Sequence, residues 1–326
     1  MAYPADIPEK ILLELYTSML EIRKVELRIE ERYHEDEMRT PIHLCIGQEA
    51  VSAGVCANLE REDYVFSNHR GHGHYLAKKG DLKAMLAELY NRETGCSRGR
   101  GGSMHLIDLQ SGLPGSSSIV AGGIPIATGT ALASLMKKDN RVSVVFFGDG
   151  AAEEGVLYES INFAVLKKLP VIYVCENNLY SVCSPLMRRQ TTADIYKRAQ
   201  GFAIPACRID GNDAVEVYLT AGQAVERARN GEGPSFIQCD TYRLKDHHGT
   251  KTGVEIGYRE QEELDLWASR CPVKKLEELL IREGILTEDK LASVSEAIDH
   301  DIEEAFEYAR SSPLPDKNEL MRDIYC

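Results

Sequence analysis

Two polar clusters in this 326-residue chain have residue types that suit a magnesium site. The first is Gly148-Asp149-Gly150, and the second is Asn177-Asn178. A carboxylate, an amide oxygen and a backbone carbonyl are hard oxygen ligands, and they leave room in an octahedral Mg²⁺ shell for phosphate oxygens. The glycines let a phosphate approach backbone N–H groups at a helix start, where the helix dipole favours anions. The clusters therefore predict a site for magnesium and a phosphate-bearing ligand.

Two strands and the helix between them must position these clusters. The runs Val142–Phe147 and Val171–Cys175 are apolar and do not alternate with polar residues, so we predict two buried parallel strands. Apolar residues at helical spacing over Glu153–Lys168 predict the connecting helix. Ligands of open α/β sheets bind at the carboxyl ends of the strands. Asp149 and Asn178 are therefore expected to meet, although they are far apart in the sequence.

The residues alone leave two other interpretations of this stretch open. Gly148-Asp149-Gly150 could be a tight turn, and Asn177-Asn178 a polar strand end. A nicotinamide-binding Rossmann unit would need the pattern G-x-G-x-x-G, but Glu153 occupies the third glycine position and is a poor neighbour for a pyrophosphate. The second polar cluster, after the next strand, favours a metal and phosphate site over both.

The Gly-Asp-Gly cluster, the stretch that follows it and the closing Asn-Asn resemble the thiamine diphosphate motif. The chain looks like the alpha subunit of the decarboxylating component of pyruvate-type 2-oxo acid and acetoin dehydrogenases. This resemblance implies thiamine diphosphate and Mg²⁺ as cofactors. It also implies Asp149, Asn178 and Tyr180 as metal ligands, and Gly150 and Ala151 as neighbours of the diphosphate.

His43 begins a second block, H-x-x-x-G-Q-E-A, which leads into a predicted helix near Gly47. A lone histidine is more often a structural residue with its polar atoms satisfied than a catalytic one. Similar blocks in the family face the cofactor, so the resemblance makes His43 a candidate for catalysis. Gln48 and Glu49 are its polar neighbours.

A third block has a high density of histidines around Arg70. His69, His72 and His74 could suggest zinc, but no second cluster elsewhere has the spacing of zinc ligands. A better use of Arg70 is a charge-assisted clamp on a diphosphate. The block resembles the family's aromatic-Arg-x-His-Gly segment, which implies that His69 and Arg70 bind the diphosphate. His69 stands where many relatives have tyrosine, and the HRGHGH form looks like the acetoin dehydrogenase branch.

The segment Cys96–Gly123 is rich in Gly and Ser and has little periodicity. It could be a disordered linker, but its apolar residues, among them Ile119 and Val120, are expected to tie it down, and long loops in compact domains are commonly functional. Its GRGGSMH stretch resembles a family block. The resemblance implies that Ser118 and Val120 meet the cofactor rings through backbone groups, with Ile119 as an apolar wedge.

The polar loop Asp240–Tyr258 follows another predicted strand. His247 and His248 are candidates for proton transfer because imidazole titrates near neutral pH. Family chains commonly have Y-R-x-x-G-H-S here, which implies that His247 contacts the diphosphate side of the cofactor. The chain departs from that pattern at Asp246 and His248, and these departures put the substrate class in question.

Alternating strands and helices predict an α/β fold with a doubly wound, mostly parallel sheet of thiamine diphosphate-binding type. We expect a single domain over residues 1–326, with a helical extension at about 1–60 and a C-terminal helical region at about 259–326. Two further strands are predicted over Ala206–Asp210 and Ser235–Cys239. Helices are predicted over Pro8–Tyr33, Asp81–Arg92, Ile124–Lys138, Asp213–Arg229, Glu260–Ala268, Val273–Glu283 and Glu288–Ala309. Arg188 and Arg189 are expected to be solvated surface or a subunit contact.

Composition excludes several classes of partner. A net charge of −13 argues against nucleic acid and anionic membranes, and no apolar run approaches the ~20 residues of a membrane span. The first ten residues lack the form of a signal or transit peptide. The nine cysteines are scattered without a C-x-x-C pair, so we expect reduced thiols and a cytoplasmic location.

No glutamate stands in a block that would face the pyrimidine ring of the cofactor. The resemblance implies that a separate beta chain supplies it, in an assembly of two alpha and two beta chains. It also implies transfer of an acyl unit to a lipoyl arm of an acyltransferase, with 2-oxo acids or acetoin as donors. Extra histidines, including His72 and His74, would also suit a ketose phosphate donor. The missing third glycine speaks against an NAD-dependent dehydrogenase, and the presence of both Asp149 and Asn178 speaks against a non-catalytic scaffold.

Overall fold

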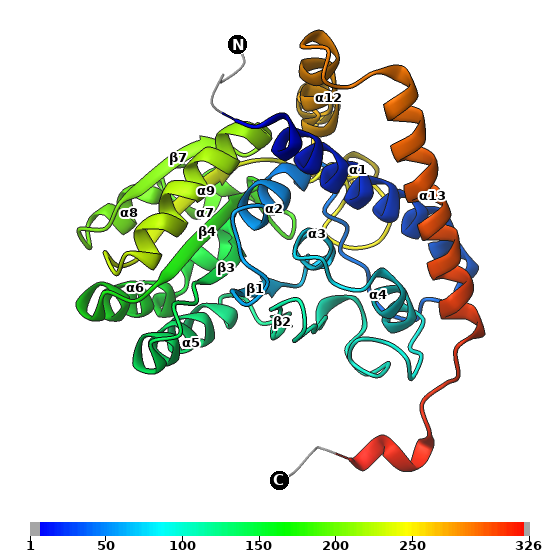
Figure 1. Ribbon diagram of the computed structural model, residues 1–326, viewed down its shortest axis with the longest axis horizontal. Coiled ribbons are helices and arrows are strands. Elements are labelled where there is room, and N and C mark those ends of the chain that lie inside the picture. The colour runs from blue at the N-terminus through cyan, green and yellow to red at the C-terminus, as the bar shows by residue number, and fades with distance from the viewer. Residues whose placement is uncertain (1–6, 323–326) are drawn as a thin grey trace.

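The computed structural model describes residues 7–322, and its centre is a six-stranded sheet in which every neighbouring pair is parallel (Figure 1). The strand order is β2-β1-β3-β4-β8-β7. Its strands are β1 (Tyr64–Asn68), β2 (Gly115–Ser117), β3 (Ser143–Gly148), β4 (Val171–Asn177), β7 (Ala206–Asp210) and β8 (Ser235–Asp240). The four predicted strands are confirmed, and the sequence analysis missed β1 and β2.

Helices cover both faces of the sheet, as a doubly wound fold requires. The α-helices are α1 (Glu9–Arg32), α2 (Glu49–Cys56), α3 (His72–Ala77), α4 (Leu82–Leu89), α5 (Gly123–Lys137), α6 (Gly155–Lys167), α7 (Leu186–Arg189), α8 (Tyr196–Gln200), α9 (Ala214–Arg229), α10 (Gly253–Ile256), α11 (Gln261–Ser269), α12 (Pro272–Arg282) and α13 (Glu288–Ser311). The 3₁₀ helices are η1 (Tyr33–Glu35), η2 (Gly102–Met104), η3 (Asp149–Glu153) and η4 (Lys317–Met321). All seven helices predicted in the list above are present, with ends shifted by a few residues at most.

Alternate residues of β3 belong to two different cores, because successive side chains of a strand point to opposite faces. Val145 and Phe147 pack in the cluster that contains residues of α5 and α6. Val144 and Phe146 pack in the larger cluster, which includes residues of α1, α3, α4 and α9. The apolar run that predicted β3 is thus buried on both sides, which is why it does not alternate with polar residues.

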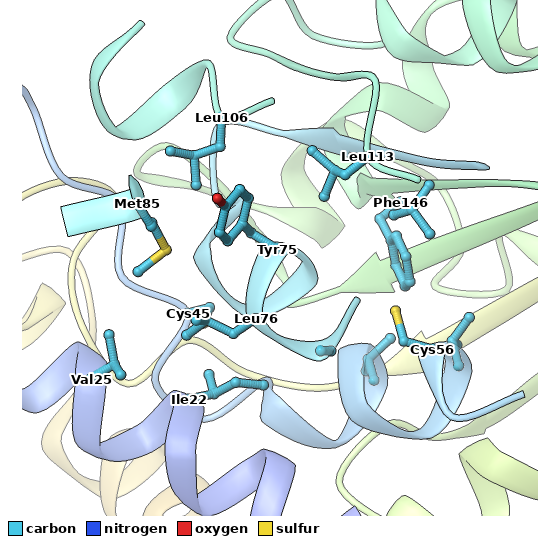
Figure 2. Packing of buried hydrophobic residues seen from close by; sticks show 14 of the residues in the cluster. Ile22, Val25, Cys45, Cys56, Tyr75, Leu76, Met85, Leu106, Leu113 and Phe146 are labelled. Atoms are coloured by element: carbon cyan, nitrogen blue, oxygen red, sulfur yellow. The ribbon is translucent and has the colours of Figure 1, made fainter. Parts of the chain in front are cut away.

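The larger core also holds the glycine-rich segment Cys96–Gly123 in place. Leu106 and Leu113 of this segment are fully buried near Tyr75 and Leu76 of α3 (Figure 2). The prediction that apolar residues tie this segment down is therefore confirmed. Ile119 and Val120, which were expected to take part, do not, because they are 73% and 53% exposed. This segment ends at α5 with its apolar tip turned out of the core.

The chain runs from β1 to β2 on one side of β1 and then returns to β3 on its other side (Figure 1). This reversal makes a topological switch point between β1 and β3, where a crevice forms at the carboxyl ends of the strands. The loops after β1, β2, β3, β4 and β8 all reach this edge. Among the residues described, no helix has the length and apolar character to span a membrane.

A candidate cofactor site at the carboxyl ends of the strands

A single pocket at the switch point brings together nearly all the site residues that the sequence analysis proposed. Its lining comes from the loops after five strands and from the segment before α2. The proposed residues that line it are His43, His69, Arg70, Ser118, Ile119, Val120, Asp149, Gly150, Ala151, Asn178, Tyr180 and His247. His248 is exposed and lies beside the pocket, with its ring centroid 6.2 Å from that of His247.

At one end of the pocket, Asp149 and Asn178 follow two neighbouring strands. Gly148 of β3 pairs with Glu176 of β4, so Asp149 lies level with Asn177, the last residue of β4, and Asn178 comes next. The Asn178 Oδ1 atom accepts a hydrogen bond from the Tyr180 backbone N–H at 3.3 Å, which brings the third predicted ligand to the same turn. A buried carboxylate, an amide oxygen and a nearby backbone carbonyl are the donor set that Mg²⁺ prefers, and the residues present fit this ion.

Arg189 contacts the Asp149 carboxylate directly, which the sequence analysis did not foresee. Its guanidinium donates to Asp149 and to Glu153, and the Arg189 side chain is only 13% exposed. Burial raises the pKa of Asp149, and the ion pair with Arg189 opposes that rise. The expectation of a solvated Arg189 is therefore wrong, because the pair closes between η3 and α7 and no local pattern announces it. Arg188 is exposed, as expected.

The middle of the pocket has features that suit a diphosphate. A side chain at Gly150 would place its Cβ 2.6 Å from the Ser181 Oγ, so only glycine lets the backbone stay open to a ligand. Arg70 is buried, and its guanidinium donates to the backbone carbonyls of Leu44 at 2.7 Å and His247 at 3.2 Å. Burial and then the charge of Arg243 lower the pKa of Arg70 to about 9, so it is still a cation at neutral pH.

At the other end, four imidazole rings lie together. The ring centroid of His43 lies 4.9 Å from that of His69, 5.0 Å from that of His247 and 6.3 Å from that of His248. Burial, followed by the charge of Arg70, lowers the pKa to about 3 for His43, about 2 for His69 and about 4 for His247. These three rings are therefore neutral at pH 7 and can accept hydrogen bonds.

The His43 Nδ1 atom is buried and has no hydrogen-bond partner within the described part of the chain. Buried polar atoms normally have a partner, because leaving one without costs free energy. An unpaired acceptor or donor that lines a pocket therefore indicates that a ligand supplies the missing hydrogen bond. The pocket fits a ligand with an anionic diphosphate at its centre and polar groups near the histidines.

Two of the histidines near Arg70 do not belong to the pocket. His72 contacts Glu26 at 2.5 Å and the Ser103 Oγ at 2.8 Å, and it is fully buried. His74 contacts the Ser67 Oγ at 2.7 Å and Glu176 at 3.4 Å. Both lie on α3, which turns them into the core, so the idea that they hydrogen-bond a donor substrate is wrong. Among the described residues, no group of three or more His, Cys, Asp or Glu side chains is placed to hold a metal ion.

The loop after β8 is ordered by Asp246, one of the two departures from the family pattern. The Tyr258 hydroxyl donates to the Asp246 carboxylate at 2.5 Å, and Arg243 donates to the Tyr258 hydroxyl at 3.0 Å. Burial raises the pKa of Asp246, but the hydrogen bond from Tyr258 and the nearby backbone and charges outweigh it and lower the pKa overall. This network fixes the chain immediately before His247.

Glu176 is a second buried group that the sequence analysis missed. It lies in β4, two residues before Asn178, and is 3% exposed. A charged residue at the end of an otherwise apolar strand was the available signal. Among the residues that line the pocket itself, Asp149 is the only carboxylate.

Comparisons with known proteins show the family of the chain. The family described as the dehydrogenase E1 component matches residues 17–318. The chain is 38% identical over 320 residues to the alpha subunit of acetoin:2,6-dichlorophenolindophenol oxidoreductase from Bacillus subtilis (strain 168). The aligned stretch covers 98% of this chain and 95% of that protein. It is 39% identical over 322 residues to the alpha subunit of the pyruvate dehydrogenase E1 component from Porphyra purpurea, which covers 97% of this chain and 93% of that protein. The chain therefore belongs to the dehydrogenase E1 component family, as its sequence predicted.

Proposed function

We propose that this chain is the alpha subunit of a thiamine diphosphate- and Mg²⁺-dependent dehydrogenase. The enzyme cleaves a carbon–carbon bond next to a carbonyl, in a 2-oxo acid or in acetoin, and passes the acyl unit to a lipoyl carrier. The observation that carries this proposal is the single pocket whose lining includes Asp149 and Asn178, a buried arginine and a cluster of neutral histidines. Membership of the E1 family implies thiamine diphosphate as the cofactor.

The pocket residues divide into those that hold the metal and those that hold the diphosphate. Asp149, Asn178 and the Tyr180 carbonyl would bind Mg²⁺. Gly150 and Ala151 would offer backbone N–H groups to the diphosphate. Three charged or polar side chains around these atoms complete the cradle, and they are Arg70, His69 and His247. Arg70 is the strongest of them, because a cation paired with a phosphate makes a charge-assisted hydrogen bond.

The histidine end is where the reacting atoms of the substrate would lie. Bound thiamine diphosphate supplies an electron sink next to the substrate carbonyl. The neutral rings of His43, His69 and His247 would hydrogen-bond and orient hydroxyl and carbonyl groups there, and exposed His248 would face the entrance. Ser118 and Val120 would meet the cofactor rings through their backbones, with Ile119 against the rings as an apolar wedge.

A second chain must complete this site, because a carboxylate that could activate the pyrimidine is lacking from the described pocket lining. We propose that a beta subunit supplies a glutamate, in an assembly of two alpha and two beta chains. Large apolar side chains are exposed at the pocket lining and on α5 and α6. They are Ile119, Val120, Ile126, Leu135, Met136, Phe163 and Leu166. Exposed apolar patches of this kind mark protein interfaces, and the acyl acceptor would be the lipoyl-bearing acyltransferase. The single-domain boundaries and the cytoplasmic location stay predictions.

The test is reduction of an artificial electron acceptor by this chain co-expressed with its beta-type partner. Pyruvate, acetoin and a ketose phosphate would be offered in turn, with thiamine diphosphate and Mg²⁺ present. We expect turnover with pyruvate or acetoin. Turnover with the ketose phosphate alone would favour the other donor class, which the hydrogen-bonding capacity of four clustered histidines would suit. Activity that is independent of thiamine diphosphate would contradict the proposal.

A further inference from the structure

A chain of buried polar side chains begins at Asn178 and continues away from the Asn178 side chain through Gln48. The Asn178 amide Nδ2 donates to the Gln48 Oε1 at 3.2 Å. The Gln48 Nε2 in turn donates to the Glu176 Oε1 at 3.5 Å, and the other Glu176 oxygen lies 3.4 Å from the His74 Nε2. The chain ends at Ser67, whose hydroxyl lies 2.7 Å from the His74 Nδ1. All five side chains are buried, so water does not compete for these contacts.

The direction of this chain is set by Glu176. The Glu176 Oε1 atom is the acceptor toward Gln48, whereas an amide has a donor end and an acceptor end that look alike in shape. Glu176 therefore binds the amino end of the Gln48 amide. That leaves the Gln48 oxygen to face Asn178, which donates with its own amino group. The preference persists at these lengths because hydrogen bonds are electrostatically stronger in a buried region than in water.

This order determines which atom Asn178 presents to the pocket. Because the Asn178 amino group donates to Gln48, the Asn178 Oδ1 faces the turn at Tyr180. There it accepts a hydrogen bond from the Tyr180 backbone N–H. A carbonyl oxygen has two lone pairs, so one is available for a cation. A reversed amide would instead point two N–H groups at the cation, which repels it. The correct orientation is therefore fixed from both ends before a metal arrives.

We infer that Gln48 and Glu176 are positioning residues that set the orientation of the Asn178 amide and so the affinity of the site for Mg²⁺. Neither residue would touch the metal. The inference rests on the proposed function, because it takes Asn178 as a metal ligand. Contacts of this kind behind a metal ligand are commonly worth about 10- to 100-fold in metal affinity.

The experiment measures Mn²⁺ binding by electron paramagnetic resonance in the alpha–beta complex with thiamine diphosphate, where Mn²⁺ stands in for Mg²⁺. We expect Gln48→Met and Glu176→Gln each to weaken Mn²⁺ binding about 10-fold or more. The matched control is Tyr173→Phe, which removes one buried hydrogen bond, to the Thr128 hydroxyl at 2.9 Å, from the opposite face of the same strand. This control should leave Mn²⁺ affinity within about twofold at a similar thermal stability.

A double variant separates orientation from mere packing. In Gln48→Glu combined with Glu176→Gln, the carboxylate and the amide exchange places. The new carboxylate still requires the amino end of Asn178, so the Asn178 oxygen still faces the cation. We expect the double variant to regain most of the Mn²⁺ affinity that Glu176→Gln loses. No recovery in a folded double variant, or unchanged affinity in both single variants, would overturn the inference. Failure of the wild-type complex to bind Mn²⁺ at all would instead overturn the proposed function.

Discussion

The two ends of the pocket handle buried charge in opposite ways. We call the part of the pocket where Asp149 and Asn178 are proposed to bind Mg²⁺ the metal end. There a buried carboxylate has a partner, since Arg189 contacts Asp149. At the histidine end, the rings lose their charge, because burial and Arg70 lower the pKa values of His43, His69 and His247 to between about 2 and about 4. At the metal end, Mg²⁺ would replace the guanidinium of Arg189 beside Asp149. At the histidine end, the neutral rings would accept hydrogen bonds from a ligand without taking up charge.

The comparison also separates two ways of building a site. The metal end stands directly on paired strands, and its ligands are fixed by the register of β3 and β4. The histidine end is assembled from three loops that Arg70 joins by binding the carbonyls of Leu44 and His247. We therefore expect changes at the metal end to affect binding and stability strongly, and changes at the histidine end to have smaller and pH-dependent effects.

The largest expected effect is at the metal end. Asp149→Ala should abolish binding of thiamine diphosphate with Mg²⁺, because the ion loses its only charged ligand in the pocket. Circular dichroism should show that the fold survives, and fluorescence titration would measure the binding. The control is Glu154→Ala, a nearby exposed carboxylate that is not among the residues lining the pocket. Undiminished cofactor affinity in Asp149→Ala would remove the basis of the site assignment.

A second change at this end tests the ion pair. Arg189→Met leaves the buried Asp149 carboxylate without its cation, and breaking such a pair costs on the order of 3 kcal/mol of unfolding free energy. Urea unfolding without metal would measure the loss, and Mg²⁺ with thiamine diphosphate should restore part of it by replacing the missing charge. Arg188→Met is the matched control, since Arg188 is exposed, and it should change stability by less than about 0.5 kcal/mol.

At the histidine end, stability should fall as the pH is lowered. The pKa of His43 is about 3 in the folded protein, against 6.5 for an ordinary histidine, so the unfolded chain takes up the proton first. Its contribution is complete above pH ~7 and is lost as the pH falls through ~6.5 toward the folded value. The free energy of unfolding should therefore fall by about 1 kcal/mol less between pH 7 and pH 5.5 in His43→Gln than in the wild type. Urea unfolding at both pH values would measure this difference. An unchanged pH dependence would mean that folding does not lower the pKa of this ring.

The smallest expected effect concerns the loop that carries His247. Tyr258→Phe removes the hydrogen bond to Asp246 and should cost about 1 kcal/mol locally. Limited proteolysis should then cleave the loop over residues 244–257 faster than in the wild type, while Mg²⁺ affinity is unchanged. A drop in metal affinity as large as that of Arg189→Met would show that the two ends are not independent.

The strands that position the metal end could be predicted because each is an apolar run with a clear beginning and end. β2 could not, because Gly115–Ser117 has no apolar pattern and is a strand only through its pairing with β1. β1 was missed because this strand, Tyr64–Asn68, is only five residues long and the histidine-rich block follows it directly. Short strands whose existence depends on a neighbour leave little trace in the sequence.

Within the site, the sequence analysis identified the residues that directly follow strands. It did not identify residues whose partners are distant in the sequence. Arg189 and Glu176 owe their roles to partners that only the fold brings near. Spacing could not tell His69, which lines the pocket, from His72 and His74, because the helix that turns the latter two inward begins at His72. The family resemblance singled out His69, which lines the pocket, whereas the chemistry of the side chains alone suggested all three histidines.

The exposed apolar surface of α5 and α6 has a consequence for how the protein is made. A newly synthesised chain that has folded but not yet met its partner carries Met136 and Leu166 into solvent, each about three-quarters exposed. Such a chain is prone to self-association and is a natural client of chaperones. Matched production of the two subunits should therefore govern the yield of this protein as much as the strength of its own core.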